Sequence, residues 1–188
     1  PSKEVAEYWE HGEINWFTPS DLTSRSTLFI EESELKCNDI GLNKSSAKIF
    51  PAYSVMMTSR ATIGVLSINT TKACTNQGFI TCIPNKEFPL CYLYHWLKMS
   101  KPYFEILATG ATFAELSRGS FKKIKIYKPN IDIVEKFDAI CKPIFDEVLT
   151  LQKQLDNLNT QKNSLLPRLI SGKLSVQHLN IHYPPSMQ

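Results

Sequence analysis

The chain has 188 residues and a formal net charge of +3, and 43% of its residues are hydrophobic and 11% aromatic. This composition excludes a disordered polypeptide and predicts one folded domain with a further segment attached to it. No stretch approaches the roughly 20 apolar residues of a membrane span, and residues 1–10 lack the basic and apolar regions of a secretory signal, so we expect a cytoplasmic protein.

The charge is unevenly distributed along the chain. Residues 1–35 carry 2 basic and 8 acidic side chains, whereas residues 36–128 carry 13 basic and 4 acidic ones, a net charge of +9. A concentrated basic surface is typical of proteins that bind a polyanion, most often nucleic acid. Lysines scattered over all faces of a domain would give the same count, so charge alone leaves both interpretations open.

Apolar runs rich in β-forming residues predict strands, and helical patterns follow them. Residues 13–22 begin as a short strand, which Thr18–Asp21 ends and caps as a short helix. We expect three further strands of one sheet at 54–59, 62–68 and 78–83, followed by helices at 89–99 and 101–107. A half-buried strand with a basic outer face is expected at 121–129. Strands and helices of this kind predict an α+β fold.

The C-terminal part of the chain is predicted to be helical. We expect a short helix at about 131–141 and a long one from about 143 to 170, because Pro143 suits the first helical position and disrupts a helix interior. Gly172 is positioned to cap the long helix at its C-terminus. At about 1.5 Å per residue this helix would span roughly 40 Å, more than the width of a small domain.

A stripe of apolar residues with alternating steps of four and three runs along the long helix. Lys162 occupies its one polar place, and Phe137 and Cys141 extend the same register backwards. This a/d pattern predicts pairing with another helix. A helix that lies on its own domain is the alternative, since short heptad runs also occur in bundles. The expected dimerisation surface consists of Ile144, Val148, Leu151, Leu155, Leu158, Leu165 and Leu169.

Residues that often carry chemistry form no recognisable site. The five cysteines contain no Cys-x-x-Cys pair, which indicates reduced and mostly buried thiols. His178 and His182 stand four residues apart without a further ligand pair, so we expect no metal. Motifs for a phosphate-binding loop, an amino-methyltransferase and a methyl donor are absent, so we expect no cofactor and no catalysis by this chain.

Several stretches, in a fixed order, resemble the specificity subunit of type I restriction-modification systems. They are PSKEVAEYW with EINWFTPSDL, GLNKSSAKIFP with SVMMTSRATIG, TNQGF, ATGATFAELSRGSFKKIKIYKP, and LLPRLISGKLSV after the heptad helix. The resemblance implies a mixed α/β target recognition domain followed by a long C-terminal coiled-coil-forming helix. It places the DNA target recognition domain at 1–130, the helical spacer and dimerisation region at 131–172, and a C-terminal tail at 173–188.

A subunit of that family has two recognition domains, each followed by a long helix, and the two helices pair antiparallel. This chain matches one domain and one helix, which implies a half-sized subunit that dimerises or a fragment of a full one. It lacks the family's strand and Gly-Thr lead-in before Pro1, which implies a truncated N-terminus. The implied partners are double-stranded DNA, methyltransferase (modification) subunits, the restriction subunit through the complex, and a second copy or second recognition half. No membrane is implied, and the specificity subunit itself is non-catalytic.

DNA recognition needs cations for phosphates and forked polar groups for base edges. Ser59, Arg60 and Thr62 lie where one predicted strand ends and the next begins. Arg60 has three possible roles, a grip on guanine, a phosphate clamp or a structural fork, and its place in a motif shared across the family favours the last two. Asn76 and Gln77 either contact DNA or satisfy a turn, and we favour the turn. The lysine candidates for phosphate contact are Lys44, Lys48, Lys122, Lys123 and Lys125.

Two other functions stay open from the sequence. A coiled-coil assembly adaptor whose basic middle segment binds DNA without sequence preference would show the same stripe and the same charge. A free-standing enzyme with an unfamiliar site would show methyl transfer by the purified chain alone. A bipartite methylated DNA motif that depends on the chain would distinguish the specificity function from both.

Overall fold

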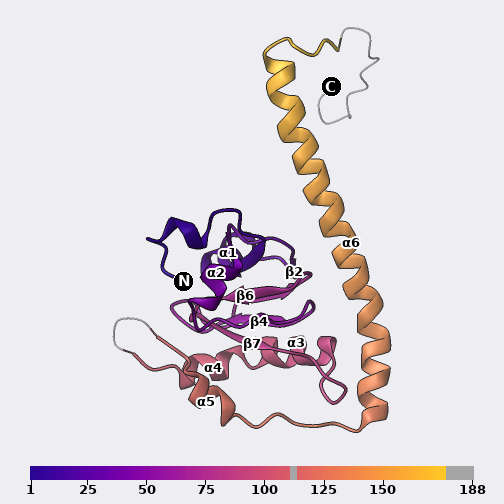
Figure 1. Cartoon of the computed structure of the whole chain (residues 1–188). Helices are drawn as coiled ribbons and strands as arrows, with labels where there is room; N and C mark the ends of the chain where they lie inside the picture. Colours follow the sequence, from indigo (N-terminus) through magenta and orange to yellow (C-terminus); the bar gives the residue numbers. More distant parts are fainter. Residues whose placement is uncertain (111–113, 177–188) are drawn as a thin grey trace. The chain divides into compact units, whose positions relative to one another are not determined.

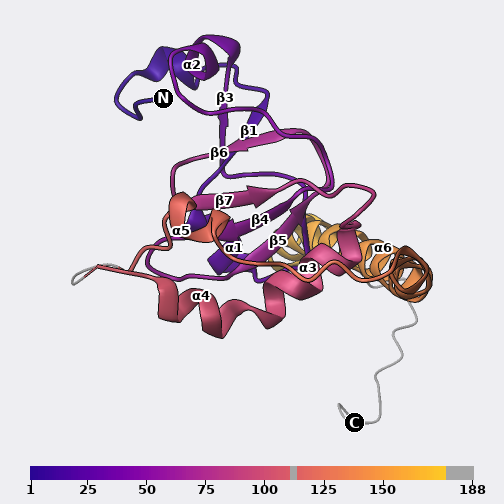
Figure 2. The same ribbon diagram turned by 90° about the horizontal axis from the view of Figure 1, so that it is seen from below.

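The computed structural model describes residues 1–110 and 114–176 (Figures 1 and 2). The chain forms two compact units, residues 1–148 and residues 149–188. Every strand found in the described residues belongs to the first unit. His178, His182 and most of the predicted tail lie outside the described residues.

The first of two sheets has three strands. Its middle strand, β1 (Ile14–Phe17), pairs antiparallel with β3 (Leu35–Cys37) and parallel with β6 (Ala73–Thr75). The strand predicted at the start of residues 13–22 is thereby confirmed. Trp16 is buried in a small apolar cluster on this sheet.

The second sheet has four strands in the order β2-β5-β4-β7. Their bounds are Phe29–Ile30 for β2, Leu66–Asn69 for β5, Val55–Thr58 for β4 and Phe79–Cys82 for β7. β5 and β7 both pair antiparallel with β4, so the three strands predicted around 54–83 do lie in one sheet. Every residue of β4 is buried, as expected for a central strand with both faces covered.

The helix α1 (Pro19–Arg25) follows β1 directly, as the sequence predicts. Thr18 is its N-cap, and the Asp21 carboxylate accepts the Thr18 N–H at 2.7 Å. Asp21 also accepts the Glu34 N–H at 2.8 Å, which ties the helix to the chain entering β3. Leu22 then reaches the main core, where it packs with residues of both sheets.

A 3-10 helix, η1 (Ala6–Tyr8), and the short helix α2 (Asp39–Asn43) contact each other beside the first sheet. Asn38 caps α2 by accepting the Gly41 N–H at 2.9 Å. Gly41 is required at this contact, because a Cβ would lie 2.8 Å from the Tyr8 carbonyl oxygen. The chain that leaves α2 enters the candidate site.

The helices α3 (Leu90–Met99) and α4 (Lys101–Leu107) confirm the two helices predicted there, with their junction at Ser100. α3 packs against β4 and β5, and both helices lie along one side of the second sheet in Figure 2. Leu97 and Phe104 are fully buried in this layer.

The strand predicted at 121–129 is wrong. The chain forms a short helix, α5 (Arg118–Lys122), and continues without regular structure to residue 130. Ser117 caps α5 by accepting the Ser120 N–H at 3.0 Å, and Phe121 packs on Phe104 with ring centroids 5.7 Å apart. The alternation of lysine and isoleucine is present, but no neighbouring strand within the described residues pairs with it.

The break predicted at Pro143 is also wrong, because α6 (Ile131–Ile170) runs through it as one helix. Proline inside a helix costs about 3 kcal/mol, and packing on both sides of it offsets this cost. Val134 and Phe145 are both buried, and the Phe145 ring lies 5.6 Å from that of Tyr94. The predicted end is confirmed, since Gly172 adopts a left-handed φ of 69° just after the helix.

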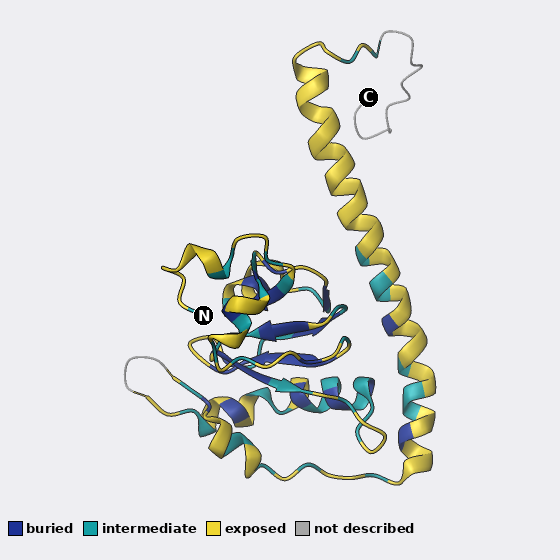
Figure 3. Ribbon diagram, in the orientation of Figure 1, coloured by how far each residue is buried: buried dark blue, intermediate teal, exposed yellow. Residues whose placement is uncertain are grey.

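The first part of α6 has one buried apolar face and one exposed apolar face. Figure 3 shows buried and exposed residues alternating along this part of the helix. Val134 and Phe145 are buried and Cys141 is partly buried, whereas Ile133 and Ile140 are exposed. At about 100° per residue, the exposed face is turned roughly 100° from the buried one. The helix therefore has room for a second apolar contact besides the one it makes within the chain.

Candidate nucleic-acid interface

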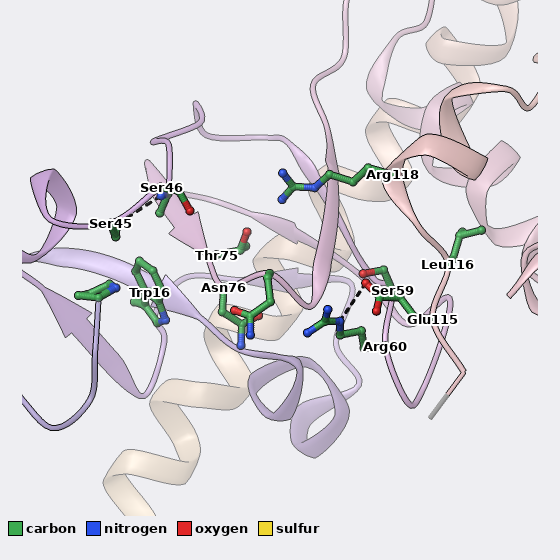
Figure 4. Close-up of a pocket in the computed structure, with 13 residues that line it drawn as sticks. Trp16, Ser45, Ser46, Ser59, Arg60, Thr75, Asn76, Glu115, Leu116 and Arg118 are labelled. Carbon is green, nitrogen blue, oxygen red and sulfur yellow. Dashed lines mark hydrogen bonds and ion pairs between the residues drawn. The ribbon is translucent and has the colours of Figure 1, made fainter. Parts of the chain in front are cut away.

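A cleft of about 350 Å³ lies in the first unit, beside the C-terminal ends of β1, β4 and β6 (Figure 4). Four of the residues predicted to bind DNA line it, namely Ser59, Arg60, Asn76 and Gln77. The other lining residues are Pro1, Trp16, Ser45, Ser46, Ala47, Thr75, Glu115, Leu116 and Arg118. The fold therefore brings candidates from separate loops to one concave surface.

The turn between β6 and β7 holds Asn76 and Gln77 beside the cleft. Asn76 donates its N–H to the Phe17 carbonyl at 3.1 Å, and its side-chain oxygen accepts the Gly78 N–H at 2.9 Å. Gly78 has no room for a side chain, because a Cβ would lie 2.8 Å from Pro19 Cγ. Asn76 therefore stabilises the turn, as favoured from the sequence, while Gln77 is exposed.

Arg60 forms an ion pair with Glu115, with 3.0 Å between Arg60 Nε and Glu115 Oε1. The two side chains are 44% and 40% exposed, so the pair lies at the surface of the cleft. An antiparallel β-bridge joins the segment of Arg60 to the segment of Glu115. In this bridge Leu116 donates its N–H to the Ser59 carbonyl at 2.9 Å. Ser59 and Leu116 are themselves buried, so the pair is attached to the core.

Thr62 is exposed in the connection between β4 and β5, and it does not line the cleft. Its carbonyl accepts a hydrogen bond from the Thr58 hydroxyl. Ala61 and Gly64 adopt left-handed conformations, with φ of 58° and 79°, which tighten the connection. In the structure, Thr62 contributes to this turn through its backbone.

All five predicted lysines are exposed, and they form two groups. Lys44 is the C-cap of α2 and Lys48 follows it, and the three residues between them line the cleft. Lys122 ends α5, Lys123 is its C-cap, and Lys125 follows. The first group thus flanks the cleft directly. The second group follows Arg118, the cleft residue that begins α5.

Two charged residues of the cleft are not among the residues predicted from the sequence. Arg118 begins α5 and is exposed, and it forms no ion pair within residues 1–110 and 114–176. In Figure 4 its side chain extends over the cleft toward Thr75. Its only signal in the sequence is its position just before the lysine run. Glu115 has no signal, because its partner Arg60 lies far away in the chain.

The residues predicted for dimerisation lie on α6, and most of them are exposed. Within this set Val148 is partly buried, and the exposed members are Ile144, Leu151, Leu155, Leu158, Leu165 and Leu169. Phe137, which extends the stripe backwards, packs on His95 with ring centroids 5.8 Å apart. Exposed Ile133 and Ile140, and not Phe137, continue the exposed stripe toward the start of α6. At about 100° of helical rotation per residue, they lie within roughly 40° of the mean direction of the stripe.

Burial raises the pKa of four of the five cysteine thiols, Cys37, Cys74, Cys82 and Cys91, and so keeps them protonated at neutral pH. Cys37, Cys74 and Cys91 are buried and the other two are partly buried. Burial raises the pKa of Cys82 to about 11, and burial with a hydrogen bond to Asp138 raises the pKa of Cys91 to about 12. The described residues contain no arrangement of three metal-ligating side chains. None of the helices described is both long and apolar enough to cross a membrane.

Comparisons with known proteins cover almost the whole chain. The family model described as "Type I restriction modification DNA specificity domain" matches residues 1–168. The type I restriction enzyme MjaIX specificity subunit of Methanocaldococcus jannaschii is 31% identical over 160 residues, which cover 84% of this chain and 37% of the relative. The HindI specificity subunit of Haemophilus influenzae is 30% identical over 178 residues, 93% of this chain and 38% of the relative. The chain thus spans about two fifths of the length of these relatives.

Two solved structures share the fold. One comes from work on the "complex assembly and conformational transition of the type I R-M system", with a TM-score of 0.56, 15% identity, and coverage of 84% of this chain and 37% of that chain. The other is the HsdS subunit of Thermoanaerobacter tengcongensis, with a TM-score of 0.52, 15% identity, and coverage of 88% and 39%. The predicted α+β fold is thereby confirmed. The family match over residues 1–168, together with the two curated relatives, shows that the chain belongs to the family of type I restriction-modification DNA specificity domains.

Proposed function

We propose that this chain reads one half of a bipartite DNA site and guides methyltransferase and restriction subunits to it as the specificity component of a type I restriction-modification complex. The chain is non-catalytic in this role and acts in the cytoplasm. The observation that carries the proposal is the cleft, which Arg60, Gln77 and Arg118 line from separate segments and which Lys44 and Lys48 flank on one side. This arrangement combines donors for base edges with cations for phosphates.

The basic middle segment of the chain, residues 36–128, supports binding to a polyanion. The net +9 of residues 36–128 includes both arginines of the cleft and all five predicted lysines. Lys122→Ala with Lys123→Ala should weaken binding to all sequences about equally, and the slope of log affinity against log salt should fall by about two. The measurement is a salt titration of duplex binding by the assembled complex. A changed sequence preference at unchanged affinity would contradict a phosphate role.

The long helix supports a pairing role. An exposed apolar stripe follows the whole length of α6, through Ile133, Ile140, Ile144, Leu151, Leu155, Leu158, Leu165 and Leu169. A stripe of this length, about 54 Å at 1.5 Å per residue, suits another helix rather than a small contact. We propose that a second copy, or a second recognition half, pairs with it and that helix length sets the distance between half-sites. The antiparallel orientation follows from the family resemblance.

The decisive experiment is methylome sequencing of cells that carry this chain with its cognate methyltransferase subunit. A bipartite methylated motif that vanishes when the chain is deleted is the expected result. Methylation without a defined motif would instead favour the assembly adaptor with only non-specific DNA affinity. Methyl transfer by the purified chain alone would overturn the non-catalytic role.

A further inference from the structure

We infer that Arg60 reads a guanine in the half-site and that Glu115 is the positioning residue that orients Arg60 for this contact. The inference rests on the proposed function and deepens it, because it names one base-reading residue and the base that it reads. It also differs from the phosphate or structural role that the sequence favours for Arg60. The evidence is the way in which the guanidinium is held.

Glu115 contacts the Arg60 guanidinium on its Nε side. The contact is made through Nε, at 3.0 Å from Glu115 Oε1. In Figure 4 the far end of the guanidinium points toward Asn76, into the cleft and away from Glu115. The two terminal nitrogens therefore form a fork that faces the cleft. Guanine presents two acceptors, O6 and N7, in the major groove, and an arginine fork donates to both.

The charge of the pair favours a base edge over a phosphate. Glu115 cancels the charge of Arg60 at short range, so a phosphate bound to the fork would also face a carboxylate. A guanine edge is uncharged and needs only correctly placed donors. Arg118 lines the same cleft but, unlike Arg60, has no ion-pair partner within the described residues. Its positive charge is therefore available to attract a phosphate.

The backbone beneath the pair is fixed, as base reading requires. Ser59 accepts the Leu116 N–H at 2.9 Å and donates its own N–H to the Gly78 carbonyl at 2.8 Å. These bonds join the loop that carries Arg60 to the segment of Glu115 and to the turn before β7. The backbone that carries Arg60 is therefore fixed on the core, and Glu115 contacts the side chain on its Nε side.

The test uses the chain assembled with its methyltransferase subunit, and it compares Arg60→Lys with Arg118→Ala. Lysine keeps the charge but loses the fork. Arg60→Lys should retain affinity for random duplex DNA and lose discrimination at one guanine of the half-site on the order of ten- to hundredfold. The methylated motif should become degenerate at that position. Arg118→Ala should weaken all duplexes alike, lower the salt slope by about one, and leave the motif unchanged.

Glu115→Gln tests the positioning role, because it keeps the shape of the side chain and removes its charge. Binding to random duplex should strengthen, since a carboxylate near the phosphates is lost, while discrimination at the same guanine should fall. The matched control is Glu87→Gln, which breaks another ion pair between distant segments, Lys128 with Glu87 at 2.5 Å. The control should leave discrimination at that guanine unchanged.

An unchanged motif in the Arg60→Lys complex would overturn the inference, and so would a half-site without guanine. In both cases the wild-type complex would still methylate a bipartite motif, so the proposed function would stand. A wild-type complex without any motif would instead remove the proposed function itself. Circular dichroism of each variant verifies that its fold is intact, and Glu115→Gln decides the question if Arg60→Lys fails to fold.

Discussion

A heptad inserted into α6 between Leu151 and Leu158 should move the two halves of the DNA site apart. Residues 153–170 are all exposed in the chain, so the insertion disrupts no packing there and preserves the a/d register. Seven residues lengthen a helix by about 10 Å, and at about 3.4 Å per base pair this equals about three base pairs. For antiparallel helices the unspecified spacer should grow by that number, while both half-site sequences stay the same.

The assay is methylome sequencing of cells that express the insertion variant with the cognate methyltransferase subunit. Three added base pairs also rotate one half-site by on the order of 100°, so the extent of methylation should fall as the spacing changes. An insertion of two residues at the same place is the control, because it turns the stripe beyond the insertion by about 200°, to the opposite side of the helix, and should abolish assembly. Retention of the original spacing at full methylation would refute the proposal that α6 sets the distance.

Three further predictions concern pairing and stability. Leu151→Asp with Leu158→Asp should abolish self-association in sedimentation experiments while the first unit stays folded, because both side chains are exposed in the chain itself. Phe145→Ala should lower the free energy of unfolding by about 3–4 kcal/mol in urea titrations, because it leaves a cavity where this buried ring packs. Burial, and then the charge of Lys98, lowers the pKa of His95, so the unfolded chain binds its proton more readily. The contribution of His95 to stability should therefore be complete above about pH 7 and be lost as the pH drops below about 6.5, and His95→Gln should remove this part of the pH dependence.

Local signals in the sequence predicted the elements whose causes are local. β-forming runs predicted β4, β5 and β7, and the segment Thr18–Asp21 predicted the capped start of α1. Gly172 predicted the end of α6, because it relieves a left-handed backbone that other residues avoid. The break predicted at Pro143 is wrong because the local preference of proline is outweighed by packing. Val134 and Phe145, on either side of Pro143, are buried against other parts of the fold and keep the helix continuous.

The sequence by itself determined the α+β class, the resemblance to a specificity subunit, the basic middle segment and the apolar stripe, because composition and periodicity act over short stretches of chain. Only the tertiary structure decided that Arg60 pairs with Glu115 and that Arg118 enters the same cleft. It also decided that residues 121–129 pair with no strand among residues 1–110 and 114–176. It also separated the buried face of α6 from its exposed stripe. These features depend on contacts between segments far apart in the chain, and the free energy of such contacts is set by the geometry of the folded protein.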